Sequence, residues 1–131
     1  MKSREPLIRA KRFKIEDARR RLSQIDAMIG EFERMASDLD RDIAAEEART
    51  GITDPRHFAY PPVAAAARQR RDNLVRSCQD LRVQRSDALD VLNEAETQLQ
   101  LAEAAGERER GSDGEGLDRR VAWRHGETAR M

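Results

Sequence analysis

The sequence predicts an all-α protein: an antiparallel two-helix coiled-coil hairpin, a rod, followed by a disordered C-terminal tail. Three observations predict this fold. Two long runs carry apolar residues in a heptad rhythm, a segment that breaks helices separates them, and their charges mirror each other about that segment. A repeat of 3.5 residues keeps one seam of a helix facing a partner helix. Charged residues make up 38% of the chain and aromatic residues only 4%, which is typical of long solvated helices.

The first helix is expected over residues 7–50, approximately. Pro6 suits the entry to a helix, and Gly51 suits a left-handed residue that ends one. The apolar residues at the two seam positions of each heptad are Ile8, Ile15, Ala18, Leu22, Ile25, Ile29, Phe32, Ala36, Leu39 and Ile43.

The second helix is expected over residues 63–105, approximately, after a loop at residues 51–62 whose two final prolines exclude a continuous helix. Its seam residues are Leu74, Cys78, Leu81, Ala88, Leu92, Ala95, Leu99 and Ala102. Gly106 is expected to end this helix. Residues 106–131 are rich in glycine and charge without periodicity, so they are predicted to form a flexible tail, disordered or weakly helical, after a hairpin domain at residues 1–105.

Two alignments of the helices, or registers, are compatible with the heptads. In an antiparallel pair the numbers of facing seam residues have a constant sum. A sum of 117 is preferred because it sets large residues against small ones, whereas a sum of 110 places Leu39 against Arg71. The layers of the preferred register include Ile15 with Ala102, Leu22 with Ala95, Ile25 with Leu92, Ile29 with Ala88, Ala36 with Leu81, and Leu39 with Cys78, and Arg85 then lies opposite Phe32.

The charge distribution favours pairing within one chain. Residues 1–21 carry nine basic and three acidic groups, and residues 93–110 carry two basic and five acidic groups. Residues 22–62 are acidic by nine to four, and residues 63–92 are basic by six to four. Folding back at the loop sets opposite charges side by side, whereas a parallel homodimer would stack like charges.

Catalytic, metal-binding and cofactor-binding residues are not expected. The two histidines, His57 and His125, are far apart in the sequence and no cysteine accompanies them. Cys78 lies on the apolar seam, where a small core residue is a simpler interpretation than a nucleophile. The chain has no glycine-rich phosphate loop, and its 25 basic and 25 acidic residues give no overall basic excess. The sequence therefore predicts a protein that is not an enzyme.

Partner-binding candidates come from two places, the basic N-terminal block and the loop. They are Arg12, Arg19, Arg20 and Arg21 in the block, and His57, Phe58 and Tyr60 in the loop. The block is either a solvated face neutralised by the acidic end of the second helix, or a docking site for an acidic protein surface or for phosphates. The loop aromatics either plug the end of the core or form a contact patch.

Localisation is expected to be cytoplasmic. No apolar stretch follows the N-terminus as it would in a signal peptide, and the longest uncharged apolar stretch, residues 63–67, is too short to span a bilayer. The lone Cys78 fits a reducing compartment.

Several segments of the chain resemble the flagellar export protein FliJ family in its alphaproteobacterial form. The resemblance is carried by residues 7–15 (LIRAKRFKI), 19–22 (RRRL) and 25–29 (IDAMI), by the stretch from residue 32 to 52, and by the loop at residues 54–61 (DPRHFAYP). The loop string distinguishes the chain from a generic coiled coil. The likeness covers residues 5–105, approximately, and leaves the tail unmatched.

The resemblance implies a non-enzymatic stalk-like component of the flagellar type III protein export apparatus, needed for flagellum assembly and motility. Its implied partners are the hexameric export ATPase, the export-gate membrane protein and export chaperones, without nucleic acid. It implies a cytoplasmic protein, peripheral at the cytoplasmic face of the inner membrane through that complex. The alternatives are a generic cytoplasmic coiled-coil adaptor or a virulence-type secretion stalk, and less so a basic-arm binder of nucleic acid or membrane surfaces.

Overall fold

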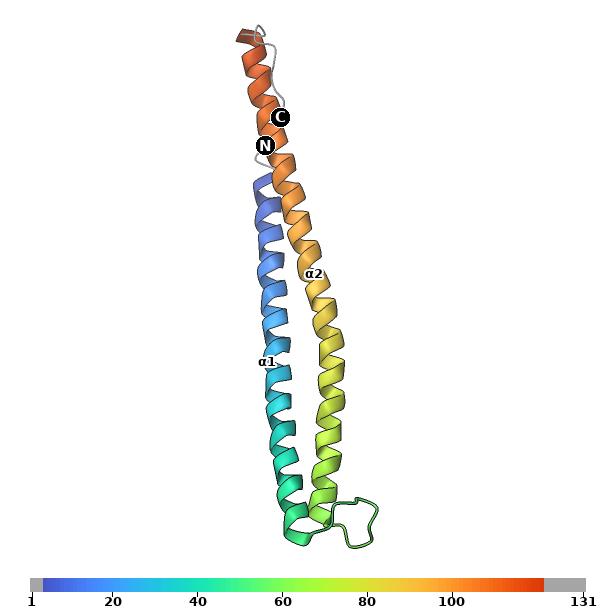
Figure 1. Ribbon diagram of the computed structural model, residues 1–131. Helices are drawn as coiled ribbons and strands as arrows, with labels where there is room; N and C mark the ends of the chain where they lie inside the picture. The colour runs from blue at the N-terminus through green and yellow to red at the C-terminus, as the bar shows by residue number, and fades with distance from the viewer. Residues whose placement is uncertain (1–3, 122–131) are drawn as a thin grey trace. The chain divides into compact units, whose positions relative to one another are not determined.

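The chain folds into two long α-helices, as predicted. A computed structural model describes residues 4–121, with side chains for residues 4–111. Helix α1 spans Arg4–Thr50 and helix α2 spans Pro62–Val121, and residues 51–61 connect them (Figure 1). The prediction of an all-α two-helix hairpin is confirmed.

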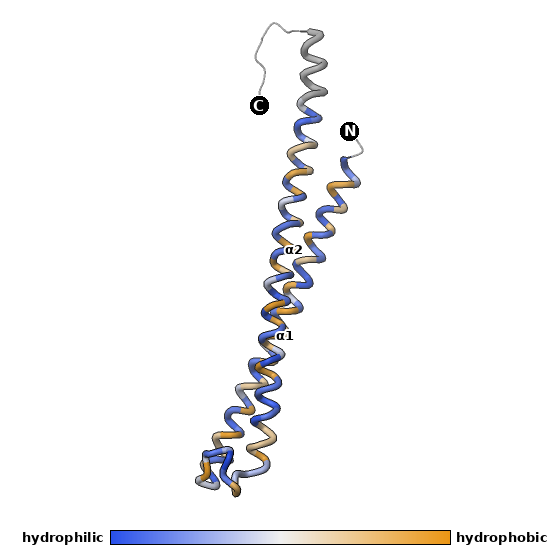
Figure 2. Tube along the Cα trace, turned by 90° about the vertical axis from the view of Figure 1, so that its right-hand side faces the viewer, coloured by the Kyte–Doolittle hydropathy of each residue, from blue (hydrophilic) through white to orange (hydrophobic). Residues whose placement is uncertain are grey.

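The helices contribute to two compact units. Of the described residues, unit 1 comprises 4–19 and 91–121, and unit 2 comprises 20–90. Within each unit the α1 and α2 segments lie side by side and run in opposite directions (Figure 1). In both helices apolar residues recur at short intervals among hydrophilic ones, as Figure 2 shows. This pattern gives each segment one apolar stripe that it can bury against the other.

The core of unit 2 centres on Ile25, which is only 1% exposed. Ile25 forms a buried cluster with Leu81 and Ala88 of α2. Three partly buried α1 residues pack against this cluster: Leu22, Ile29 and Phe32. Two helices alone cannot enclose every seam residue, which explains why most α1 seam positions here stay half-buried.

The preferred register is wrong in unit 2, and the rival with a sum of 110 describes the structure. The preferred register would set Leu81 against Ala36, whereas Leu81 shares its cluster with Ile29. It would also set Cys78 against Leu39, whereas the Cys78 Sγ atom lies 4.0 Å from the carbonyl oxygen of Ile29. The helices are therefore offset by one heptad from the expected alignment.

Arg71, which argued against this register, and Arg85 are both accommodated by neighbouring carboxylates. The Arg71 guanidinium lies 2.7 Å from Asp40 and 2.9 Å from Asp72, measured between nitrogen and oxygen. Arg85 forms an ion pair with Asp26, so it lies beside Ile25 and not opposite Phe32 as expected. A long arginine stem covers apolar surface while its head stays in water, so an arginine at a seam position costs little.

The end of α2 also differs from the prediction. Gly106 does not end the helix, which continues to Val121. A glycine inside a helix costs only about 1 kcal/mol relative to alanine, and Gly106 is buried in unit 1, where the Ile8 Cδ1 atom lies 4.0 Å from the position that a Cβ would take. The predicted end of the second helix at Gly106 is thus wrong, and residues 122–131, with His125 and Trp123, lie outside the described residues.

The other helix ends agree closely with the prediction. Gly51 has a φ of 76°, and its N–H donates to the Glu47 carbonyl oxygen at 2.8 Å, so it ends α1 in the left-handed conformation. Pro62 is the first residue of α2, a position where the missing N–H costs no hydrogen bond. Helix α1 begins three residues earlier than expected, at Arg4.

Candidate interaction surfaces

Three arginines of α1 in unit 1 pair with glutamates of α2. The ion pairs are Arg4 with Glu109 at 3.0 Å, Arg12 with Glu103 at 3.0 Å, and Arg19 with Glu96 at 3.4 Å. Two of these pairs are separated by one heptad on each helix, as expected for adjacent antiparallel helices. Each exposed pair contributes only about 0–1 kcal/mol, so the pairs select orientation more than they supply stability.

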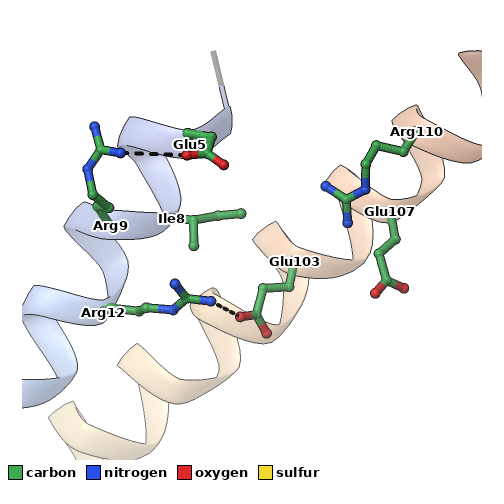
Figure 3. Close-up of a pocket in the computed structure, with 7 residues that line it drawn as sticks. All are labelled: Glu5, Ile8, Arg9, Arg12, Glu103, Glu107 and Arg110. Atoms are coloured by element: carbon green, nitrogen blue, oxygen red, sulfur yellow. Dashed lines mark hydrogen bonds and ion pairs between the residues drawn. The ribbon is translucent and has the colours of Figure 1, made fainter. Parts of the chain in front are cut away.

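A hollow at the end of unit 1 has a lining of mixed charge (Figure 3). Its lining residues are Glu5, Ile8, Arg9, Arg12, Glu103, Glu107 and Arg110. Arg9 lies 3.6 Å from Glu5 on the same helix, and Arg12 reaches across to Glu103 (Figure 3). Three guanidinium groups and three carboxylates share this surface, so it is not a site of one sign for a phosphate group. Such a surface suits contact with another protein.

The four basic candidates divide between the units. Arg12 and Arg19 lie in unit 1, and their side chains remain 61% and 58% exposed despite their ion pairs. Arg20 and Arg21 lie in unit 2. Arg21 donates to Gln84 Oε1 at 3.5 Å, and Arg20 also interacts within the chain. The structure therefore gives all four arginines intramolecular interactions and leaves all four exposed.

The loop between the helices is held by hydrogen bonds of its own. The Asp54 carboxylate accepts from the Arg56 N–H at 2.9 Å, and the Asp54 carbonyl accepts from the His57 N–H at 3.0 Å. His57 Nδ1 accepts from the Ala59 N–H at 2.9 Å, and the His57 carbonyl accepts from the Tyr60 N–H at 3.0 Å. These turns fix the backbone locally.

The two loop aromatics differ in burial. Tyr60 folds back and is 8% exposed. Phe58 is 96% exposed and stacks on His57 with ring centroids 4.8 Å apart. The structure thus assigns Tyr60 to the end of the core, and leaves Phe58 and His57 as the exposed pair available to a partner.

Tyr60 is fastened by two charged residues that the sequence did not single out. Its hydroxyl donates to the Glu47 carboxylate at 2.7 Å and accepts from Arg68 Nε at 3.0 Å. Arg68 also lies 3.7 Å from Glu47, and its guanidinium carbon lies 6.0 Å from the centre of the Tyr60 ring. This contact joins the loop to the ends of both helices.

The Tyr60 contact predicts a loss of stability at high pH. Burial first, and then the hydrogen bond to Glu47, raise the pKa of Tyr60 above its usual value of 10.0. Because the folded-state pKa exceeds the unfolded one, this stabilisation is complete below pH 10 and is lost as the pH rises through the higher folded-state pKa. We expect Tyr60→Phe to flatten that alkaline decline in unfolding experiments between pH 8 and pH 12, approximately. An alkaline decline as steep as that of the wild type would contradict the assignment.

In the described part of the chain, no side chains come together as a metal-binding site or a nucleophilic centre. Among these residues, no group of three or more His, Cys, Asp and Glu side chains could hold a metal ion. Cys78 is 4% exposed within the core of unit 2. Over the same residues, no helix is both long and apolar enough to cross a membrane.

Comparison of the chain with protein-family models, curated proteins and solved structures finds no match.

Proposed function

We propose that this protein is a non-enzymatic, stalk-like component of the flagellar type III protein export apparatus. In this role it couples the export ATPase ring to the export gate, assists export chaperones, and is needed for flagellum assembly and motility. It works in the cytoplasm and at the cytoplasmic face of the inner membrane, where it is held through the export complex.

The observation that carries the proposal is the loop at residues 54–61, which resembles the FliJ family and connects two antiparallel helices of one chain. A stalk needs two helices paired with each other and has no need of a catalytic centre. Antiparallel pairing in both units, with ion pairs such as Arg12–Glu103 and Arg82–Glu33, supports this requirement.

The accessible arginines support a docking role for unit 1. The Arg12 and Arg19 side chains are more than half exposed although each is paired. An exposed guanidinium can exchange its intramolecular carboxylate for one on a partner at little cost, because exposed ion pairs are weak. We therefore assign these two arginines to the contact with the ATPase, and Phe58 with His57 to the contact near the gate.

A charge-swap experiment tests the ATPase contact. The double variant R12E/R19E removes both arginines and also breaks both intramolecular pairs. The quadruple variant R12E/R19E/E96R/E103R restores the pairs with reversed polarity. We expect the double variant to bind the purified export ATPase at least about tenfold more weakly, a loss of about 1.4 kcal/mol, and the quadruple variant to regain thermal stability without regaining affinity.

The matched control is R76E, since Arg76 in unit 2 bonds, among the residues with described side chains, only to Asn73 of its own helix. Its affinity should stay within about twofold of the wild type. Recovery of binding in the quadruple variant would show that the arginines act only within the chain. Normal motility and filament export in a strain lacking this protein would overturn the proposed function itself and favour a generic adaptor.

A further inference from the structure

The two long edges of unit 2 differ in chemistry. On one edge, ion pairs join the helices: Asp26 with Arg85, Glu33 with Arg82, and Asp40 with Arg71. The opposite edge, here called the methionine edge, carries Met28 and Met35 of α1 beside Ser77 and Gln84 of α2, by their heptad positions. Its one interhelical hydrogen bond among the described residues joins Arg21 to Gln84.

The methionine edge exposes apolar surface in a line. Met28 and Met35 are 44% and 43% exposed, and their spacing of seven residues puts them on one face of α1. Next to Met35 lies a groove between the helices with Leu39 and Leu74 in its wall. Asp38, Arg70 and Asn73 complete the lining of this groove.

This stretch of α1 has more apolar positions than a two-helix pair uses. A two-stranded seam needs two apolar residues per heptad, whereas a helix in a larger bundle carries three. Between residues 22 and 39 the methionines supply the third position, and they remain uncovered in unit 2. The pattern therefore fits a third helix lying along this edge.

Acidic residues flank the methionine edge on both sides. Glu31 and Asp38 each follow a methionine by three residues on α1, and Asp80 and Asp87 follow Ser77 and Gln84 by three residues on α2, so all four lie beside the edge. Glu31 and Asp38 pair with arginines of their own helix. Asp80 and Asp87 form no ion pair with any residue between 4 and 111. Arg21 and Arg70 mark the two ends of the edge.

We propose that the methionine edge of unit 2 binds a basic amphipathic helix of a partner protein. Its apolar stripe covers Met28 and Met35 and enters the groove beside Leu39 and Leu74. Its lysines or arginines face the acidic residues on both flanks, chiefly the unpaired Asp80 and Asp87. A second copy of this chain fits less well, because it would set acidic flanks against acidic flanks. This site is separate from the export role and does not depend on it.

The test uses two designed helical peptides of 21 residues, approximately, which share leucines at the apolar positions and differ only in lysine or glutamate flanks. Binding to the full-length protein is followed by fluorescence anisotropy at two salt concentrations. We expect the lysine peptide to bind at least about tenfold more tightly than the glutamate peptide, and to weaken as salt rises.

Two variants and two matched controls locate the site. M28S/M35S removes the apolar line and D80K/D87K reverses the α2 flank, and each should weaken the lysine peptide by about tenfold or more. V83S and D90K make equivalent changes at exposed positions on the outer face of α2, and should stay within about twofold. All four change exposed residues, so their melting curves should match that of the wild type.

Three outcomes overturn the proposal. One is equal binding, or no binding, of the two peptides. Another is a loss in V83S or D90K as large as in the edge variants. The third is a dimer of the protein alone, detected by sedimentation and abolished by M28S/M35S, which would make this edge an interface between copies. Failure of any of these tests leaves the ATPase contact of Arg12 and Arg19 unaffected.

Discussion

Replacing Ile25 by Asp is expected to lower the free energy of unfolding by about 4 kcal/mol. Ile25 is 1% exposed at the centre of the unit 2 cluster, so the variant loses nearly the whole burial of the side chain and gains a desolvated carboxylate. Small proteins are stable by only about 5–15 kcal/mol, so this change would leave the variant close to unfolding at 37 °C. Urea titration followed by circular dichroism measures the loss.

The matched control for this substitution is Val83→Asp. Val83 is also a branched apolar residue in a helix of unit 2, but it is 63% exposed. Its replacement should change stability by no more than about 0.5 kcal/mol. A similar loss in both variants would mean that Asp acts through helix propensity, and that Ile25 does not lie in a core.

Leu81→Ala is expected to cost about 2–5 kcal/mol, because Leu81 is 5% exposed in the same cluster and its truncation leaves a cavity. The substitution also reports the register. Combined with Ile29→Ala, it should show a coupling energy of about 0.5–3 kcal/mol, since both side chains share one cluster.

The comparison for this coupling is Leu81→Ala combined with Ile43→Ala. Ile43 is buried as well, at 5% exposed, but lies fourteen residues from Ile29 along α1, a distance of about 21 Å. The two effects should add within about 0.5 kcal/mol. Additivity of Leu81→Ala with Ile29→Ala would contradict the observed alignment of the helices.

The fold could be predicted because the heptads and Gly51 are local sequence signals for the two helices and for the turn between them. A repeat of 3.5 residues requires a partner helix, and a glycine followed by prolines requires a turn, so both helices and their direction follow from sequence. The end of α2 did not follow from Gly106. A single glycine costs about 1 kcal/mol, and the packing of Ile8 against it, a contact distant in sequence, outweighs that cost.

The register could not be predicted because successive heptads look alike. Two criteria favoured the wrong offset: large side chains were set against small ones, and Arg71 opposite Leu39 was taken as unfavourable. In the structure Asp40 and Asp72 hold that guanidinium outside the seam. The hydrogen bond of Tyr60 to Glu47 brings the end of the loop back beside α1, which favours the observed offset.

The candidate surfaces were predicted in part. Mirrored charge blocks predicted that the α1 arginines face acidic residues, and in the structure Arg12 and Arg19 pair with Glu103 and Glu96. No such signal predicted that Phe58 is exposed and Tyr60 is buried, because the direction of each ring depends on the conformation of the turns. Glu47 and Arg68 were missed because neither lies in a motif.

Disulfide cross-linking tests most directly whether each chain pairs with itself in the observed register. In a C78S background, cysteines at positions 29 and 81 should oxidise rapidly within one chain and give a monomer of altered electrophoretic mobility. Cysteines at positions 36 and 81, which face each other in the register with a sum of 117, should form a disulfide only slowly. Faster cross-linking of the second pair would contradict the observed register. Covalent dimers as the main product of the first pair would contradict the single-chain antiparallel hairpin on which the proposed stalk depends.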